Sequence, residues 1–574
     1  MKYFKQLNKI LSTSQKKAFV FLTLLMFVSM LFEILTLNSL FLLLTLFTNP
    51  SSLENSKFLI FFKDADFGYN FYLQFLIIFF IIFFLKTIIN IFIIWKEKNY
   101  INLTRAEISY QFFKGYIYMP RIFHLRTNIS ETTKNLTDEI NSLISALLAI
   151  SIITLETFVL IGLIIFLLFI NFKITLLSFF SLLIFSFLLS YLNTKKIILM
   201  GKDRVKLFRV RLKHIIEGLS GAKIFALTGS QEKLIADFKN TNLKIASIGA
   251  STDFRNEIPR PLFELFILLI AIFFLFFFLK DNSEFKTLIP TLGVFLTAAY
   301  RLAPSLGKIL SSIQRFQYSI QSAKKLSIDK EKFLTQEEKD PSTESLEFNN
   351  EIKINNISYS YNKNLKQEKN FVLKNVDFEI KQNSKIGIMG KSGSGKSTLL
   401  DLLMAIIAPQ DGEILVDGKD LARHKKSWYK IIGCVPQDVF ILDDTLKKNI
   451  AFGLPDNQIE INKLNKAIEL ANLTELKRNL RYGLDTLVGE KGSRLSGGQR
   501  QRIGIARALY NEPNVLFFDE PTSALDIETE KKIINEVFLQ QKNKTIIFVS
   551  HNRENLKYCD TIYEMKDRKL LKIN

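Results

Sequence analysis

A glycine-rich segment between a short apolar strand and a helix carries the clearest chemical signal in the sequence. Its residues are Gly390, Lys391, Ser392, Gly393, Ser394, Gly395, Lys396, Ser397 and Thr398. Backbone N–H groups of such a loop curl around phosphates, and the dipole of the following helix favours negative charge. Lys396 is expected to reach the β- and γ-phosphates of a nucleotide and Ser397 to ligate Mg²⁺. The predicted strand over 385–389 and helix over 397–405 favour this P-loop over a plain glycine-rich turn.

Two adjacent carboxylates, Asp519 and Glu520, end the apolar run Val515–Phe518. In a parallel sheet the carboxyl ends of the strands form the edge where ligands bind. Asp519 is therefore expected to hold Mg²⁺ through water, and Glu520 to polarise the water that attacks a phosphate. Because these carboxylates follow a P-loop, they predict hydrolysis of a nucleoside triphosphate.

A glycine pair opens another helix, predicted over 500–510. The residues before and at its start are Leu495, Ser496, Gly497, Gly498 and Gln499, and such a helix start is a second anion site. The run is identical to the LSGGQ signature of ABC ATPases, and the C-terminal part of the chain resembles that family. The resemblance implies that ATP lies between two ATPase domains, with the P-loop of one facing the signature of the other. One copy of each motif then implies a dimer.

The resemblance also implies roles for residues outside these motifs. Gln437 matches the catalytic and Mg²⁺-binding glutamine of the family, His551 matches its histidine, and Ser523–Asp526 completes the set. Tyr361 matches the aromatic residue that stacks on adenine. Tyr359 stays open as the alternative, because alternation along a strand places both side chains on one face. ATP and Mg²⁺ are the implied cofactors.

The composition indicates a membrane protein. The chain has 574 residues, of which 48% are hydrophobic and 53 are Phe, and its mean hydropathy is +0.16. A soluble protein rarely contains so much Phe. The two cysteines, Cys434 and Cys559, form neither a metal motif nor a disulfide framework, and we interpret them as small buried side chains.

Apolar runs that could cross a bilayer, which takes about 20 residues, fill the first half of the chain. Six spans are predicted, over 18–47, 71–95, 140–170, 174–192, 261–279 and, more weakly, 288–302. Residues 1–17 suit an amphipathic elbow helix on the inner membrane face. The predicted fold class is thus an all-α six-helix transmembrane domain, 18–327, and an α/β P-loop ABC ATPase domain, 351–574, joined by a polar linker, 328–350.

The formal charge of +21 has two interpretations, nucleic-acid binding or basic loops beside anionic lipid headgroups. Lys and Arg cluster in two long polar connections, 96–139 and 193–260. Basic residues mark the cytosolic side of a membrane protein, so both connections are predicted to be cytosolic and no nucleic-acid partner is expected. In ABC exporters, which the chain resembles, such loops couple the two domains.

Three cations fall within or at the ends of apolar runs: Lys86, Arg260 and Arg301. Cations near a bilayer interior are costly and usually functional, although each of these side chains could instead snorkel to the interface. Together they could line a substrate cavity for a phosphate-bearing headgroup. Their sequence contexts resemble the bacterial lipid-linked oligosaccharide flippase of protein N-glycosylation, as does the external segment Ser56–Phe62, a candidate amphipathic helix.

These observations predict a homodimeric ATP-driven exporter of the bacterial inner membrane, with its ATPase domain in the cytosol. The predicted cargo is a polyprenyl-diphosphate-linked oligosaccharide or a similar amphipathic lipid, moved from the inner to the outer leaflet. A multidrug, lipid or peptide exporter is the alternative within the class. A non-transporting ABC regulator is the rival from another class, disfavoured because Glu520, His551 and the signature are intact.

Overall fold

The computed structural model describes residues 2–48, 71–280, 285–337, 345–361, 371–521 and 527–573. The chain divides into two compact units. The helical unit comprises Met1–Met119 and Thr127–Gln336, and the sheet unit comprises Pro120–Arg126 and Glu337–Asn574. The segment Ser56–Phe62, predicted as an external helix, lies outside the described residues.

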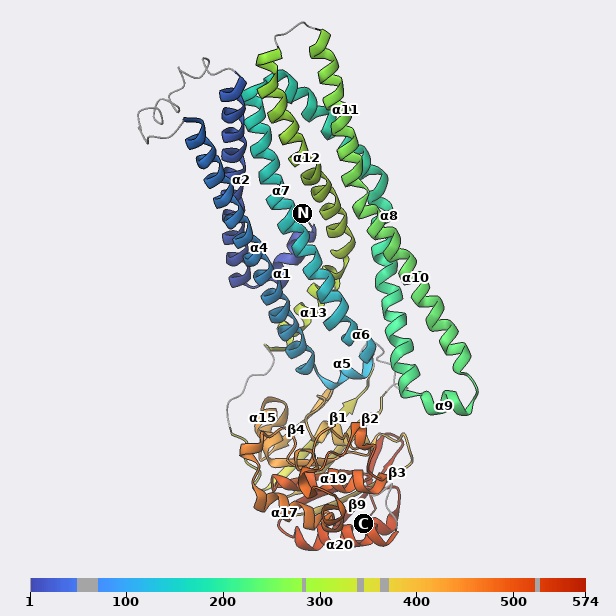
Figure 1. The fold of residues 1–574 in the computed structure, drawn as a ribbon. Coiled ribbons are helices and arrows are strands. Elements are labelled where there is room, and N and C mark those ends of the chain that lie inside the picture. The colour runs from blue at the N-terminus through green and yellow to red at the C-terminus, as the bar shows by residue number, and fades with distance from the viewer. Residues whose placement is uncertain are drawn as a thin grey trace. The chain divides into compact units, whose positions relative to one another are not determined.

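Helices make up the described part of the helical unit, and several of them are long (Figure 1). They are α1 (Lys2–Ile10), α2 (Thr13–Thr48), α4 (Phe71–Ile117), α6 (Ile129–Lys134), α7 (Ile140–Ile170), α8 (Phe172–Ser220), α9 (Ala222–Leu227), α10 (Gln231–Glu257), α11 (Pro259–Lys280), α12 (Phe285–Ser319) and α13 (Gln321–Glu337). A π-helical turn, η2 (Asn135–Glu139), joins α6 to α7. The core of the unit lies where α2, α7 and α12 meet, around Leu163, Val294 and Ala298.

Within the described residues, four helical segments are long and apolar enough to cross a membrane. They are Thr13–Thr45, Phe75–Ile117, Ile129–Ile170 and Phe172–Ser220. The predicted spans over 261–279 and 288–302 fall on α11 and α12, which are not among these four segments, so six spans stay a prediction.

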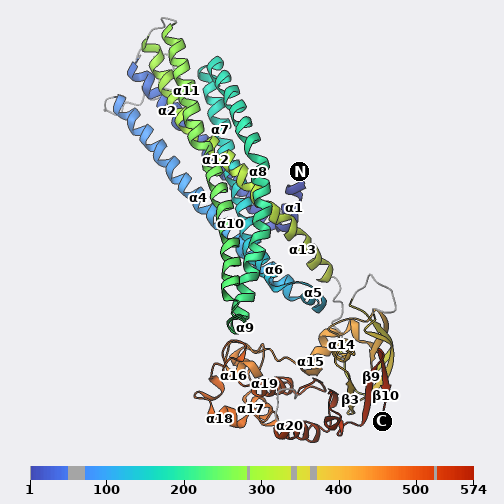
Figure 2. The ribbon, with the colours of Figure 1, turned by 90° about the vertical axis from the view of Figure 1, so that its right-hand side faces the viewer.

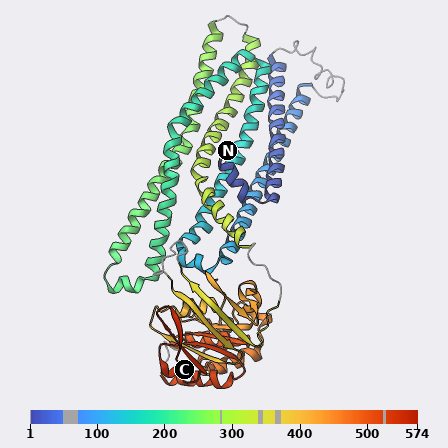
Figure 3. The same cartoon turned by 180° about the vertical axis from the view of Figure 1, so that it is seen from behind.

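The polar connections predicted between spans are largely helical. The 47 residues of α4 correspond to about 70 Å at 1.5 Å per residue, more than twice the roughly 30 Å of a hydrocarbon core. Helix α8 likewise continues through the basic segment after residue 192 and pairs with α10, with α9 at the tip of the hairpin (Figure 3).

The helix α13 extends into the segment predicted as a linker, because several contacts anchor it. Tyr116 donates a 2.9 Å hydrogen bond to Asp329, and a Cβ on Gly115 would collide with the ring of Phe333. On its other side α13 meets α1, where Lys9 pairs with Glu331 at 2.5 Å and Lys330 donates to the carbonyl of Ile10 at 2.6 Å.

The described strands of the sheet unit form two sheets, and Figure 2 shows the unit turned by 90° from the view of Figure 1. One is four-stranded in the order β2-β1-β4-β5, with β1 (Glu351–Tyr359), β2 (Leu373–Lys381), β4 (Asp411–Val416) and β5 (Lys419–Asp420). The other is six-stranded in the order β10-β9-β3-β8-β7-β6, with β3 (Lys385–Gly390), β6 (Ile432–Val435), β7 (Val515–Asp519), β8 (Thr545–Val549), β9 (Thr561–Lys566) and β10 (Lys569–Lys572). Its pairings are parallel except at β10.

Helices cover both faces of the larger sheet, which explains the uninterrupted apolar sequence of its central strands. Leu516 and Phe518 of β7 join the core built by α17 (Ile461–Leu470), α19 (Gly497–Tyr510) and α20 (Ile527–Gln540). Val515 and Phe517 join the opposite core, with α14 (Lys396–Leu403), α15 (Lys425–Ile431) and the smaller sheet. The other α-helices in the described part of the unit are α5 (Arg121–Arg126), α16 (Leu446–Ile450) and α18 (Thr474–Asn479).

Candidate functional site

The loop Gly390–Thr398 connects β3 to the first turn of α14, as the sequence predicts. Gly395 caps α14 with a φ of 108°, a backbone conformation that side chains with a Cβ rarely adopt. The Lys396 side chain is buried and folds back over the loop, donating to the carbonyls of Gly390 at 2.9 Å and Lys391 at 3.1 Å. The buried Ser394 hydroxyl has no hydrogen-bond partner within the described residues. A buried ammonium and an unsatisfied hydroxyl in one loop fit a phosphate ligand.

Three predicted residues from separate segments converge on a fourth, Glu520. Its carboxylate accepts a 3.2 Å hydrogen bond from Gln437 and lies 3.7 Å from the Lys396 ammonium and 3.8 Å from Nδ1 of His551. Glu520 follows β7 with a φ of 48°, a conformation seldom adopted by residues other than glycine. Such strained backbone clusters at functional sites, and here it turns the carboxylate toward the P-loop lysine.

Asp519 lies beside the first turn of α14. Burial raises the pKa of its carboxyl group, and a hydrogen bond with Ser397 opposes that rise. A hydroxyl and a carboxylate are hard oxygen ligands of the kind that Mg²⁺ prefers. Ser397 and Asp519 therefore fit the predicted Mg²⁺ site, and Gln437, its third predicted ligand, contacts the adjacent Glu520.

The two candidate tyrosines for adenine stacking differ in exposure. Tyr359 is 2% exposed, whereas Tyr361 is only partly buried. The Tyr361 hydroxyl lies 3.1 Å from the Thr398 hydroxyl, which places Tyr361 beside the P-loop helix. The geometry thus favours Tyr361 as the surface available to a base.

The signature residues form the start of α19. Ser496 and Gln499 hydrogen-bond to each other's backbone N–H in a capping box, which fixes Gly497 and Gly498 in the first turn. No hydrogen bond or ion pair connects Ser496 or Gln499 to the P-loop in the part of the chain that the structure describes. Ser523–Asp526 lies outside that part.

A contact that sequence reasoning missed joins α5 to this site. Arg121 of α5 pairs with Asp401 of α14 at 2.5 Å, and Arg126 donates to the backbone carbonyl of Tyr361. Burial raises the pKa of Asp401 to about 6, although Arg121 lowers it. The one signal in the sequence is a lone carboxylate among the leucines of α14.

The two cysteines have no role in the candidate site. Cys434 and Cys559 are free and partly buried. Burial raises the pKa of each thiol to about 12, so both remain protonated and unreactive at neutral pH.

The predicted cations of the helical unit fall into two places. Lys86 of α4 and Arg301 of α12 both pair with Glu33 of α2, at 2.8 and 2.9 Å. Arg260 instead pairs with Glu264 at 3.0 Å, and its side chain is 70% exposed. The sequence does not reveal Glu33 as their common partner, although it is a carboxylate within an apolar run.

Arg260 lines a separate cavity of about 610 Å³, where α10, α11 and α12 meet. Lys308, which sequence reasoning missed, lines the same cavity and pairs with Glu156 at 2.7 Å. The buried Glu156 also accepts a 2.7 Å hydrogen bond from Ser305. Both cations of the cavity therefore already have a carboxylate partner.

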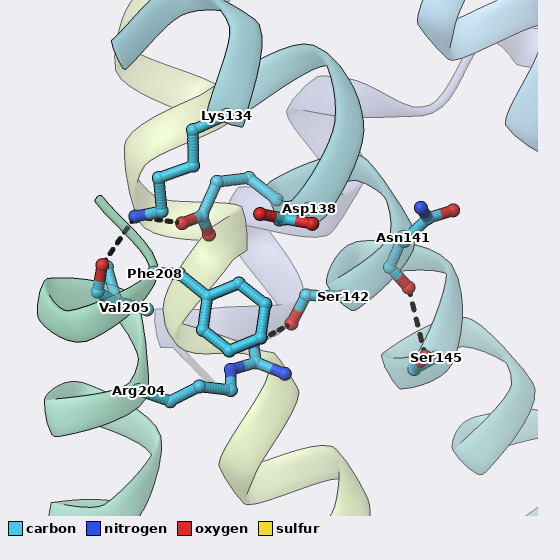
Figure 4. A pocket seen from close by; sticks show the side chains of 9 residues that line it. Lys134, Asp138, Asn141, Ser142, Ser145, Arg204, Val205 and Phe208 are labelled. Carbon is cyan, nitrogen blue, oxygen red and sulfur yellow. Dashed lines mark hydrogen bonds and ion pairs between the residues drawn. The ribbon is translucent and has the colours of Figure 1, made fainter. Parts of the chain in front are cut away.

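A smaller cavity, of about 170 Å³, lies beside the π-helical turn (Figure 4). Lys134 pairs with Glu139 at 2.7 Å and donates to the carbonyl of Val205, also at 2.7 Å. Arg204 donates to Ser142 at 2.6 Å and lies over the ring of Tyr318. The lining side chains thus largely satisfy one another, which is typical of a structural polar cluster.

Comparisons with known proteins agree with this architecture. Residues 373–523 match the family model described as "ABC transporter". The alpha-hemolysin translocation ATP-binding protein HlyB of Escherichia coli is 41% identical over 226 residues, which are 39% of this chain and 31% of that protein. The leukotoxin export ATP-binding protein LtxB of Aggregatibacter actinomycetemcomitans is 41% identical over 220 residues, which are 38% and 30%. The chain thus spans about a third of the length of these relatives.

A solved structure resembles nearly the whole chain. It is described as a bacterial Atm1-family ABC exporter with ATP bound, and it has a TM-score of 0.79 at 20% identity, covering 97% of this chain and 95% of that one. At this identity the likeness concerns the fold alone. The predicted fold class is confirmed, while the number of spans stays a prediction: the chain has the fold of an ABC exporter, in which a helical region with membrane-length apolar helices precedes a sheet-containing ABC ATPase domain.

Proposed function

We propose that the protein is an ATP-driven exporter of the bacterial inner membrane, acting as a homodimer with its ATPase domains in the cytosol. The observation that carries this proposal is the convergence of Lys396, Gln437 and His551 on Glu520, in a chain whose other unit has helices of membrane length. A non-transporting regulator would not need this set of groups.

The site residues have distinct roles in this proposal. Lys396 and the backbone of the P-loop bind the phosphates of ATP, and Tyr361 stacks on adenine. Glu520 orients the attacking water and accepts its proton, while Gln437 and His551 hold the Glu520 carboxylate in place. Ser397, Asp519 and Gln437 would hold Mg²⁺, which would offset the negative charge of the phosphates. Ser496–Gln499 of a second copy completes the ATP site.

For the cargo we propose a polyprenyl-diphosphate-linked oligosaccharide, flipped from the inner to the outer leaflet. Lys86 and Arg301 support this choice, because two cations meet between apolar helices at Glu33. A diphosphate cannot cross hydrocarbon unaided. Each charge-assisted hydrogen bond from a cation would contribute roughly 1.5–3 kcal/mol toward its desolvation. Arg260 adds a cation at the separate cavity.

Export of a peptide is the second candidate. The names of HlyB and LtxB favour it, since they refer to translocation of alpha-hemolysin and export of leukotoxin.

Exporters of neutral drugs or lipids would gain nothing from Lys86 and Arg301. The cargo test is therefore the response of transport to loss of these charges.

The experiment measures glycan flipping in proteoliposomes beside ATPase activity. The variant replaces Lys86, Arg260 and Arg301 with Gln, and Glu33→Gln is added so that no buried carboxylate is left unpaired. Flipping should be abolished while basal ATPase activity persists. Flipping at the parental rate would refute the cargo assignment, and loss of both activities would mark these residues as structural.

A further inference from the structure

Glu33 occupies the centre of a charged triad formed by three helices. Its Oε2 atom pairs with Lys86 at 2.8 Å, and its Oε1 atom pairs with Nε of Arg301 at 2.9 Å. The three side chains come from α2, α4 and α12, and the Glu33 side chain is 5% exposed. One carboxylate thus holds two cations inside apolar helices.

The triad has a net charge of +1, because Glu33 offsets only one of its two cations. Lys86 and Arg301 have no carboxylate partner other than Glu33 among the residues that the structure describes. A charge within a membrane span is costly unless it is paired. Two cations therefore share one anion, and the site lacks one negative charge.

A bound anion would supply the missing negative charge at the more exposed cation of the triad. The Arg301 side chain is 32% exposed, whereas Lys86 is 17% exposed. Only Nε of Arg301 bonds to Glu33, so in the described residues its two terminal nitrogens are not engaged. These nitrogens form the planar fork with which arginine binds phosphate.

We propose that Glu33, Lys86 and Arg301 form an anion subsite with a built-in counter-ion, in which Glu33 limits how tightly the phosphate headgroup of the cargo is held. This inference rests on the proposed function. In the empty site Glu33 keeps both cations oriented. In the loaded site it repels the phosphates, so that the headgroup binds through the excess charge and can still leave.

A neighbouring contact makes this idea testable without loss of the fold. Ser29 of α2 donates a 2.7 Å hydrogen bond to Asn90 of α4, one helical turn from Glu33 and Lys86 on each helix. This bond holds α2 and α4 together when the charges change. Glu33→Gln is therefore expected to fold.

The experiment measures equilibrium binding of radiolabelled farnesyl diphosphate to the full chain in phosphatidylcholine nanodiscs, with farnesol as the neutral probe. Glu33→Gln should bind the diphosphate at least about 10-fold more tightly and Lys86→Gln at least about 10-fold more weakly, because unit charges interact strongly in a partly dry site. Glu33→Gln with Lys86→Gln restores the net charge of the triad and should return affinity toward wild type. Farnesol should bind all variants equally.

The matched control is Glu217→Gln, which removes an exposed carboxylate from its pair with Lys213 and should leave affinity unchanged. If wild type binds but Glu33→Gln binds no more tightly, the inference is overturned and the proposed function stands. If only Glu33→Gln binds, the inference stands and the anionic cargo fails. If neither binds, both fail. Should Glu33→Gln alone not fold, the double variant must bind more tightly than Lys86→Gln, or the inference is wrong.

Discussion

Glu520 has the most exacting local geometry among the site residues. Its backbone is held in a left-handed conformation, and its carboxylate is shared by Gln437 and Lys396. Glu520→Gln keeps the shape and the contact with Gln437 but removes the base. We expect ATP binding to persist and steady-state turnover to fall at least about 100-fold, within the range assigned to general-base catalysis.

The measurement is ATPase turnover of purified Glu520→Gln protein beside nucleotide occupancy, which should show a trapped ATP-bound state. Glu528→Gln is a suitable control, because Glu528 pairs with Lys532 on the exposed side of α20. Near-normal turnover of the Glu520→Gln protein would refute the assignment of Glu520 as the general base.

Residues with a recognisable motif were predictable, and residues defined by their partner were not. The P-loop, Glu520 and His551 follow strand ends in a fixed order, so the sequence locates them. Glu33 and Asp401 can be interpreted only through their ion-pair partners, Arg301 and Arg121, which lie 268 and 280 positions away in the sequence. A single sequence contains no signal for such pairings, because only the fold brings these elements together.

At the scale of elements, α5 is joined to the P-loop helix through a carboxylate that is costly to ionise. Burial raises the pKa of Asp401 from its ordinary 3.8 to about 6. Between these values the folded chain binds more protons than the unfolded chain, so this group lowers stability as the pH rises through that window. Above pH 6 the cost is roughly 3 kcal/mol, at about 1.36 kcal/mol per pKa unit.

Asp401→Asn should therefore stabilise the full chain at pH 7.5 by about 1–3 kcal/mol and have little effect near pH 4. Arg121→Gln should move the pH window upward, because Arg121 lowers the pKa of Asp401. Thermal unfolding at several pH values measures both, with the exposed Asp411→Asn as control. An Asp401→Asn effect that does not change with pH would contradict this account.

Element type was easier to predict than element length. The apolar runs indicated helices, but α4 and α8 continue far into basic segments that hydropathy separates from the spans. Their polar parts are held by tertiary contacts, such as Arg204 with Ser142. Likewise α13 is helical because Tyr116 and Phe333 anchor it, a reason that composition cannot convey.

At the scale of the whole molecule, the proposed homodimer predicts ATP sites shared between chains. Lys396→Ala damages the P-loop and Ser496→Arg damages the signature, so each homodimer has two impaired sites. A mixed dimer should have one intact composite site and one doubly damaged site. Nucleotide binding to isolated mixed dimers measures this, and two equally impaired sites would instead favour ATP sites built within single chains.

The pairing of α1 with α13 has a consequence for biosynthesis. Lys9 and Glu331 are separated by 322 positions, and chains grow at about 5–20 residues per second, so the first helix waits about 15–60 s for its partner. During that time the apolar side of α1 must contact lipid or a chaperone. Docking of α13 then comes late in assembly, when nearly all of the helical unit has already left the ribosome.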